Sequence, residues 1–141
     1  MKDIEIAKNL LDKEKKAIVI VKDKIMIFSS EGRGIKPVYT ALNELKGELR
    51  GSSAADKVVG KAAAMIYEYA GIKELSTMLI SEGAINVLKN TPIIYEYEKS
   101  VSYIENRDRS GMCPVENLSL NIDNIDELQE EISSFLKNTN Q

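Results

Sequence analysis

Two apolar runs constrain the fold of this chain more than any other feature of its sequence. Residues 17–21 are Ala-Ile-Val-Ile-Val, and residues 75–80 contain Ser76 and Thr77 as their only polar members. Short runs of this kind, without regular alternation of polar and apolar positions, are typical of strands that are covered on both faces of a sheet. Because segments with helical periodicity alternate with these runs, we expect an α/β fold, organised as a three-layer α-β-α sandwich.

Apolar residues recur at helical spacing in several other segments of the chain. Pro37 suits the first turn of one such helix, and Gly71 suits the end of the next. Ser53 followed by Asp56 resembles a capping box, which places the start of that helix at residues 55–57. In chain order, helices are expected around residues 4–11, 37–45, 55–70, 84–88 and 123–137, with a frayed tail at 138–141.

The strands are expected between these helices. Residues 17–21 and 25–28 are apolar and are separated by Lys22-Asp23-Lys24, which predicts a hairpin. Further strands are expected at residues 75–80, 93–97, 101–104 and 118–122. A chain of 141 residues fits one domain, so residues 1–141 are interpreted as a single domain.

The composition excludes several classes of function. With no histidine and a single cysteine, the chain lacks the ligands of the common zinc-hydrolase sites. Its net charge of −3 offers no basic surface of the kind that nucleic acid binding requires, so we expect no nucleic acid partner. No apolar run approaches the roughly 20 residues of a membrane helix, so we expect no membrane partner.

The expected location is a reducing cytoplasm. A single cysteine permits no intramolecular disulfide. The first residues, Met1-Lys2-Asp3-Ile4-Glu5, carry charges where a signal peptide would have its apolar run.

Four segments of the chain combine into a recognisable pattern. They are Gly32-Arg33-Gly34-Ile35-Lys36-Pro37, Ala55-Asp56-Lys57-Val58-Val59-Gly60-Lys61-Ala62-Ala63-Ala64, Asn106-Arg107 and Cys113-Pro114-Val115-Glu116. The pattern covers most of the chain and resembles the uncharacterised prokaryotic family called domain of unknown function 1893. The resemblance implies a cytidine deaminase-like fold, with a mixed central sheet and helices on both faces.

The resemblance also directs attention to the positions where true deaminases hold zinc. In those enzymes one helix starts with a His or Cys ligand and a proton-shuttling Glu, and the next starts with two Cys ligands. The corresponding starts are expected at Ala55-Asp56-Lys57 and at Ser81-Glu82-Gly83-Ala84, and neither contains such a ligand. We therefore expect the fold without its zinc chemistry, and we predict no cofactor.

The first of these helix starts is the strongest candidate for a binding site. Free backbone N–H groups at a helix start favour anions, and Ser52, Ser53, Asp56 and Lys57 lie there. Lys61 is expected one turn later on the same face, where two ammonium groups would suit a phosphate. Helix capping by Ser53 and Asp56, with solvated lysines, explains the same residues without any ligand.

Other candidates are weaker motifs. Arg33 and Gly34 can bring a guanidinium and backbone to a phosphate, although a tight turn explains Gly32-Arg33-Gly34 equally well. Cys113 and Glu116 are candidate catalytic groups, but the thiol lacks a histidine base, and such residues are more often packing or capping groups. The residues predicted to contact a ligand are Arg33, Gly34, Ser52, Ser53, Asp56, Lys57, Lys61, Ser81, Glu82 and Asn106.

Oxygen ligands and tyrosines leave two more possibilities open. Asp56, Glu82 and Glu116 contain enough oxygens for a Mg²⁺ site, although nothing in their spacing demands one. Tyrosines can stack on a nucleobase, although they more often pack half-buried. The tyrosines in question are Tyr67, Tyr69, Tyr95, Tyr97 and Tyr103.

These residues favour a small-molecule binding module, for a nucleotide or phosphorylated nucleoside, on a deaminase-like fold that has lost zinc catalysis. The alternative is a metal-independent enzyme acting on a nucleotide, with Asp56 as nucleophile or base and Cys113 or Glu116 assisting. A third interpretation uses the small residues Gly60 and Ala64 as a contact between copies in a homo-oligomer.

Overall fold

The computed structural model describes residues 1–139. Its helices are α1 (Asp3–Lys13), α2 (Lys36–Leu45), the 3-10 helix η1 (Lys46–Leu49), α3 (Lys61–Ala70), α4 (Glu82–Leu88), α5 (Pro114–Ser119) and α6 (Ile125–Thr139). Its strands are β1 (Ile18–Lys22), β2 (Ile25–Ser30), β3 (Ser53–Val59), β4 (Glu74–Ser81) and β5 (Ile94–Val101).

The strands form one mixed sheet of five, in the order β2-β1-β3-β4-β5. Strand β1 pairs antiparallel with β2 and with β3, whereas β3, β4 and β5 run parallel to one another. The two apolar runs of the sequence lie in β1 and β4, inside the sheet rather than at its edges. The predicted α/β fold and the predicted hairpin of residues 17–28 are therefore confirmed.

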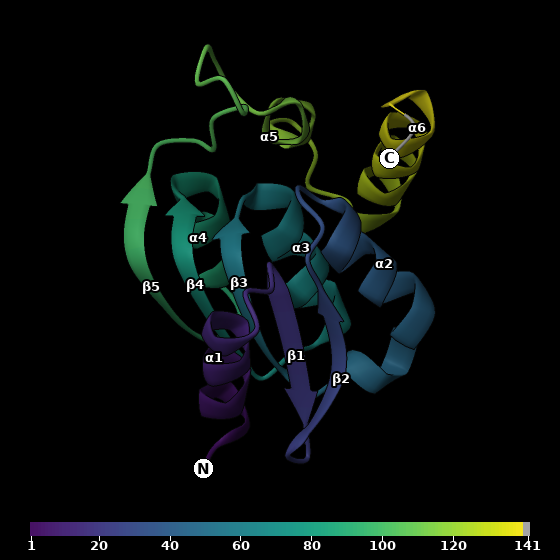
Figure 1. Ribbon diagram of the computed structural model, residues 1–141. Coiled ribbons are helices and arrows are strands. Elements are labelled where there is room, and N and C mark those ends of the chain that lie inside the picture. The colour runs from purple at the N-terminus through teal and green to yellow at the C-terminus, as the bar shows by residue number, and fades with distance from the viewer. Residues whose placement is uncertain (140–141) are drawn as a thin grey trace.

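Helices cover both faces of the sheet (Figure 1). Helix α1 lies on one face, where Ala7 and Leu11 pack with Val19, Val21 and Ala55. Helices α2, α3 and α4 lie on the other face, over the larger core. The layers follow from the alternation of side chains along each strand, because successive residues point to opposite faces and both sets are apolar in β1.

One element differs from the sequence prediction in a way that moves the candidate site. Residues Ser53–Val59, expected to open a helix, form the central strand β3. The strand is fixed by its ladders, since Ala55 pairs with Val19 of β1 and with Ser76 of β4. Two neighbouring strands supply far more backbone hydrogen bonds than the local preference of alanine for helix can offset.

The helix itself begins at Lys61, with Gly60 as its N-terminal cap. The proposed capping box of Ser53 and Asp56 is therefore wrong, because both residues lie in β3. Lys57 and Lys61 do not share a helix face either, since only Lys61 is helical.

Three smaller predictions also need correction. Residues 93–97 and 101–104 were expected to be separate strands, but a single strand, β5, spans Ile94–Val101. Residues 118–122 do not form a strand, because Pro114 opens helix α5 just before them. Helix α6 extends to Thr139, so residues 138–139 are helical; the remainder of the expected frayed tail, 140–141, lies outside the described residues.

Replacing Gly71 by Ala is expected to cost about 1–2 kcal/mol of stability. Gly71 ends α3 with φ of 74°, and an added Cβ would lie 2.8 Å from Nη1 of Arg50. Urea unfolding would measure the loss. Gly47→Ala is the matched control, because a Cβ at Gly47 meets nothing within 4 Å. Equal midpoints for the two variants would contradict this reading of Gly71.

Candidate ligand-binding pocket

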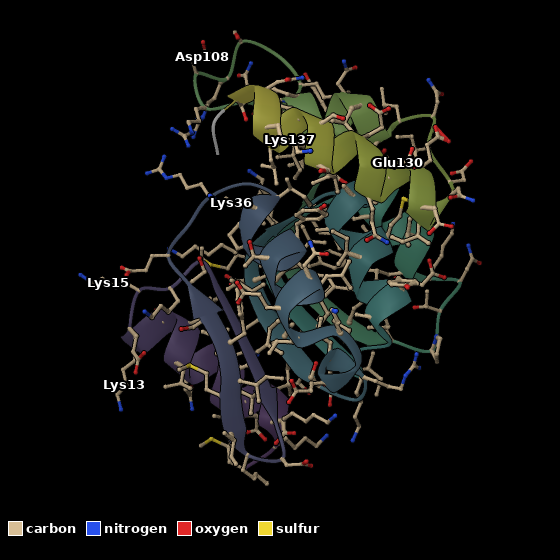
Figure 2. All side chains as sticks on the ribbon, turned by 90° about the vertical axis from the view of Figure 1, so that its right-hand side faces the viewer. Lys13, Lys15, Lys36, Asp108, Glu130 and Lys137 are labelled. Carbon is tan, nitrogen blue, oxygen red and sulfur yellow. The ribbon has the colours of Figure 1, made fainter. Side chains whose placement is uncertain are left out.

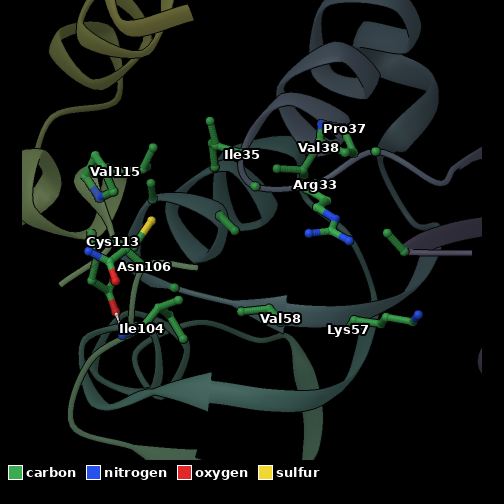
Figure 3. A pocket seen from close by; sticks show the side chains of 18 of the residues that line it. Arg33, Ile35, Pro37, Val38, Lys57, Val58, Ile104, Asn106, Cys113 and Val115 are labelled. Carbon is green, nitrogen blue, oxygen red and sulfur yellow. Dashed lines mark hydrogen bonds between the residues drawn. The ribbon is translucent and has the colours of Figure 1, made fainter. Parts of the chain in front are cut away.

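A pocket of about 670 Å³ lies where the carboxyl end of β3 faces the loop before α2 and the start of α5. Segment 104–108 and Phe135 of α6 also border it. Figure 3 shows Ile35 and Val38 on one side, Cys113 and Val115 on another, and Val58 below them. The pocket therefore collects residues from six separate parts of the chain, since Ala17 and Ile18 also line it.

The walls of the pocket are mostly apolar. The apolar side chains that line it include Ile18, Ile35, Val38, Val58, Ile104, Val115 and Phe135. Val58 of β3 lies on this surface and is 44% exposed. An apolar hollow with a few polar groups is the usual form of a small-molecule site.

Asp56 is the acidic group that β3 directs into this pocket. Its Oδ2 accepts a hydrogen bond of 2.6 Å from the Tyr67 hydroxyl, and its Oδ1 accepts a weaker one of 3.3 Å from the Val58 backbone N–H. Burial raises the pKa of Asp56 from 3.8 to about 7, although these hydrogen bonds lower it. The pKa of Tyr67 is raised well above its usual range, mainly by burial and next by the nearby Asp56 charge. Asp56 can therefore gain or lose a proton near neutral pH.

Cationic side chains border the same pocket. Arg33, Lys57 and Arg107 line it and are exposed. Within residues 1–139, the ion pairs are Lys8–Glu96, Lys16–Glu31 and Lys61–Asp123, so none of these three cations has a carboxylate partner there. Figure 3 shows the Arg33 guanidinium directed toward the space above β3. The backbone turn that places Arg33 uses Gly34, whose φ is 71°.

Three further predicted residues also line the pocket. Cys113 is half-buried, and Figure 3 shows its sulfur directed into the pocket. Asn106 lines the pocket, but its side chain is bonded to Ser110, from whose backbone N–H it accepts and to whose Oγ it donates. Glu116 is 5% exposed, and its two oxygens accept from the backbone N–H groups of Lys61 and Ile104.

The other predicted ligand contacts lie elsewhere. Ser52 and Ser53 are buried at the opposite end of β3, where the Ser52 hydroxyl donates to the Leu49 carbonyl. Ser81 caps α4 by accepting from the Ala84 N–H at 3.2 Å, and Glu82 follows it on the exposed side. Neither these four residues nor Lys61 is among the residues that line the pocket.

A family model described as domain of unknown function (DUF1893) matches residues 6–136. The chain belongs to this family. Its structure is similar to the crystal structure of a DUF1893 family protein (TM1506) from Thermotoga maritima. The two share 26% sequence identity and a TM-score of 0.83, over 90% of this chain and 85% of that one.

A second solved structure, Acinetobacter baumannii RibD in form 2, is more distantly similar. It shares 20% identity, with a TM-score of 0.46, over 90% of this chain and 38% of RibD. No curated protein matches the sequence. Over residues 1–139 of this DUF1893 family member, no helix has the length and apolar character needed to cross a membrane.

One of the two helix starts compared with the zinc positions of deaminases was placed wrongly for this DUF1893 family member. The first helix start after β3 is Gly60-Lys61-Ala62 rather than Ala55-Asp56-Lys57, whereas the second is Ser81-Glu82 as expected. In the described part of the chain, no three His, Cys, Asp or Glu side chains are grouped so that they could hold a metal ion. Asp56, Glu82 and Glu116 therefore do not form the carboxylate cluster that the sequence left open.

Sequence reasoning missed three features of the pocket. Tyr67 was considered only as a stacking or packing residue, yet it is 1% exposed and donates to Asp56. Phe135 and Arg107 were not among the residues predicted to contact a ligand, yet both line the pocket. The strand–helix order of β3 and α3 would have brought Asp56 and Tyr67 together, had residues 53–59 been identified as a strand.

Proposed function

We propose that this DUF1893 protein is a small-molecule binding module, and that its ligand is a nucleotide or a phosphorylated nucleoside. The observation that carries the proposal is one pocket that combines apolar walls with Arg33, Lys57 and Arg107, which have no carboxylate partner within residues 1–139. Its volume of about 670 Å³ is within the range of small-molecule sites. An apolar ring system between the walls, with an anionic group at the cations, matches both sets of residues.

Arg33 and Arg107 support an anionic group on the ligand. The carboxylates that line the same pocket, Asp56, Glu105, Asp108 and Glu116, would face the polar or neutral parts of that ligand. An arginine fork binds phosphate or carboxylate oxygens in two parallel hydrogen bonds, which a lysine cannot do. Arg33 precedes α2, and Arg107 lies in another part of the pocket wall, in segment 104–108. Neither helix start contains a His or Cys ligand, so we propose binding by protein groups without zinc. The single cysteine of the chain supports a reducing cytoplasm as the place where this occurs.

Arg33→Ala is expected to weaken nucleotide binding about tenfold to a hundredfold, because a charge-assisted hydrogen bond is lost. Isothermal titration calorimetry with AMP, CMP, GMP and UMP would measure the change. Lys36→Ala is the matched control. Lys36 is an exposed cation that lines a second hollow, between β2 and the start of α2, and it does not line the pocket. The control is expected to change affinity less than about threefold.

Two results would contradict the proposal. The first is that none of the four nucleotides binds to the wild-type protein. The second is that Arg33→Ala and Lys36→Ala weaken binding equally, since the effect would then be one of overall charge. Intact-mass spectrometry under native and denaturing conditions provides an independent measurement, because a retained ligand adds mass only in the native spectrum.

The structure also offers support for a second candidate, a metal-independent enzyme that acts on a nucleotide with Asp56 as base or nucleophile. The specific observation is that burial raises the pKa of Asp56 to about 7, the range that suits a general base at neutral pH. Cys113 borders the same pocket, whereas both oxygens of Glu116 are already bonded to backbone N–H groups. Turnover of a bound nucleotide that survives Asp56→Asn unchanged would rule out this role.

A further inference from the structure

Residues 104–112 form a hairpin-like segment, called the strap below, that borders the pocket with Ile104 and Asn106. Inside the strap, the Asn106 N–H donates to the Gly111 carbonyl at 2.9 Å, and Glu105 bridges to Met112. At its base, the Cys113 N–H donates to the Ile104 carbonyl at 2.8 Å. Figures 1 and 2 both show the strap, which includes Asp108, projecting beyond the sheet and its helices. The strap is therefore folded mainly by its own hydrogen bonds.

The strap has little else to hold it against the rest of the protein. Apart from the bond at its base, the one hydrogen bond that leaves it within residues 1–139 runs from the Ile104 N–H to Oε2 of Glu116, at 2.6 Å. No ion pair of the described residues involves the strap. The position of this pocket wall thus depends on the Glu116 carboxylate, the bond at the base of the strap and the packing of Ile104 beside Gly60.

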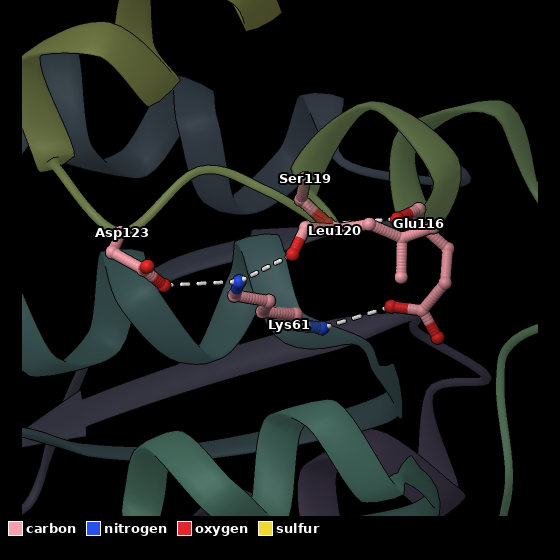
Figure 4. Close-up of polar contacts among 5 residues, drawn as sticks. All are labelled: Lys61, Glu116, Ser119, Leu120 and Asp123. Carbon is pink, nitrogen blue, oxygen red and sulfur yellow. Dashed lines mark hydrogen bonds and ion pairs between the residues drawn. The ribbon is translucent and has the colours of Figure 1, made fainter.

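The other oxygen of that carboxylate is bonded to a different part of the pocket. Oε1 of Glu116 accepts from the Lys61 backbone N–H at 3.0 Å, at the start of α3 (Figure 4). Gly60 leaves the space that this contact needs, because a Cβ there would lie 2.8 Å from the same oxygen. Both oxygens act as acceptors, so one side chain joins the strap to the start of α3.

Glu116 itself is held firmly in place. It is 5% exposed, its carbonyl accepts from the Ser119 hydroxyl, and α5 is followed by a second attachment to α3. There the Lys61 ammonium donates to the Leu120 carbonyl at 3.1 Å and to Asp123 at 3.2 Å (Figure 4). Helix α5 is therefore attached to α3 at Glu116 and again just after its C-terminal end, and the strap is the part that can detach.

We propose that Glu116 is a positioning residue of the pocket: it latches the strap to the start of α3, and release of this latch opens the route by which a ligand enters and leaves. The latch itself requires only the contacts of the pocket wall. The ligand route rests in addition on the proposed binding function. The strap carries Arg107, so closing it also brings one cation to the ligand.

Amide hydrogen exchange of the unliganded protein tests the latch. Glu116→Gln replaces one acceptor oxygen by an NH₂ group, which cannot accept from a backbone N–H. We expect the Ile104 amide and the strap amides to exchange about tenfold faster, while amides of β1, β3 and β4 change less than about twofold. Glu131→Gln, the same change at an exposed position of α6, is expected to leave the strap unaffected.

Gly60→Ala tests the same contact without changing a charge. Its φ of −97° is open to alanine, so the variant acts through the contacts of the added Cβ, 2.8 Å from Oε1 of Glu116 and 3.3 Å from Cγ1 of Ile104 in the strap. It is expected to accelerate Ile104 exchange in the same way. The latch is overturned if neither variant accelerates Ile104, if the sheet amides accelerate equally, or if both variants fail to fold, because Glu116 would then serve overall stability.

The route is tested with a nucleotide that the wild-type protein binds. Glu116→Gln is expected to increase the dissociation rate about tenfold. An unchanged dissociation rate together with faster Ile104 exchange would overturn the route. If no nucleotide binds to the wild-type protein, the proposed function and the route fail together, while the exchange result still decides the latch.

Discussion

Above pH 7, replacing Asp56 by Asn is expected to make the folded protein more stable than the wild type, and this difference is expected to disappear near pH 4. Burial raises the pKa of Asp56 from 3.8 to about 7 in the folded state. Between these two values the folded state binds more protons than the unfolded state, so stability falls as pH rises. Below both pKa values Asp56 is protonated in the folded and in the unfolded state. Above both values it is ionised in the two states, and the loss of folding stability no longer changes with pH.

The size of this effect follows from the pKa difference. A rise from 3.8 to about 7 corresponds to at most about 4 kcal/mol. The side chain is half-buried and borders the pocket, so we expect about 1–3 kcal/mol. Asn is neutral at every pH, and its carbonyl oxygen can still accept from the Tyr67 hydroxyl, so the variant removes mainly the charge.

Urea unfolding of both proteins at several values between pH 4 and pH 8 would measure this effect. The informative quantity is the difference in free energy of unfolding between Asp56→Asn and wild type, because other titrating groups cancel from it. Asp12→Asn makes the same chemical change at an exposed position of α1 and serves as the control. A difference for Asp56→Asn that stays constant with pH would show that burial does not shift this carboxyl group.

Ile132→Ala is expected to destabilise the protein by about 3 kcal/mol, within the range for large-to-small changes in a core. Ile132 and Leu128 are the two residues of α6 that are 0% exposed, and they anchor that helix in the larger core. The next turn carries Phe135, which borders the pocket, so loosening α6 also removes part of a pocket wall. Calorimetric melting would measure the stability, and nucleotide affinity should fall in parallel.

Glu131→Ala is the control for this experiment, since Glu131 precedes Ile132 in the same helix and is exposed. It is expected to change stability by less than about 0.5 kcal/mol. If both variants melted with the wild type, α6 would contribute little to the core, and the role of Phe135 in the pocket would be in doubt.

Much of the fold could be predicted because local pattern and tertiary environment agree. The run Ile18–Val21 is buried on both faces, and its hairpin partner follows after a short polar turn. Pro37 lies in the first turn of α2, as its fixed backbone angle favours. In these segments the residues alone favour the observed structure.

The central strand could not be predicted because there the local preference and the tertiary environment disagree. Ala54 and Ala55 favour a helix when isolated, and Val58 and Val59 continue an acceptable helical spacing. The small alanines suit β3 for another reason, because they are buried on opposite faces of the sheet, in the larger core and under α1. That reason depends on neighbouring elements and is not visible in a single segment.

The candidate site was predicted only in part for the same reason. Arg33, Asp56 and Cys113 do line one pocket, but Ser52 and Ser53 were grouped with them through a helix that does not exist. Tyr67 bonds to Asp56 across a strand-to-helix connection, which a motif search along the sequence does not reveal.

The bond between Glu116 and the first N–H of α3 links residues that are 55 positions apart. During synthesis, α3 and the sheet strands leave the ribosome well before Glu116 does, and domains fold progressively as the chain emerges. Until α5 arrives, the start of α3 lacks this acceptor and the strap lacks its bond to Glu116. The hollow is therefore completed only after every strand of the sheet has been made, because Glu116 and Phe135 both follow β5 in the chain.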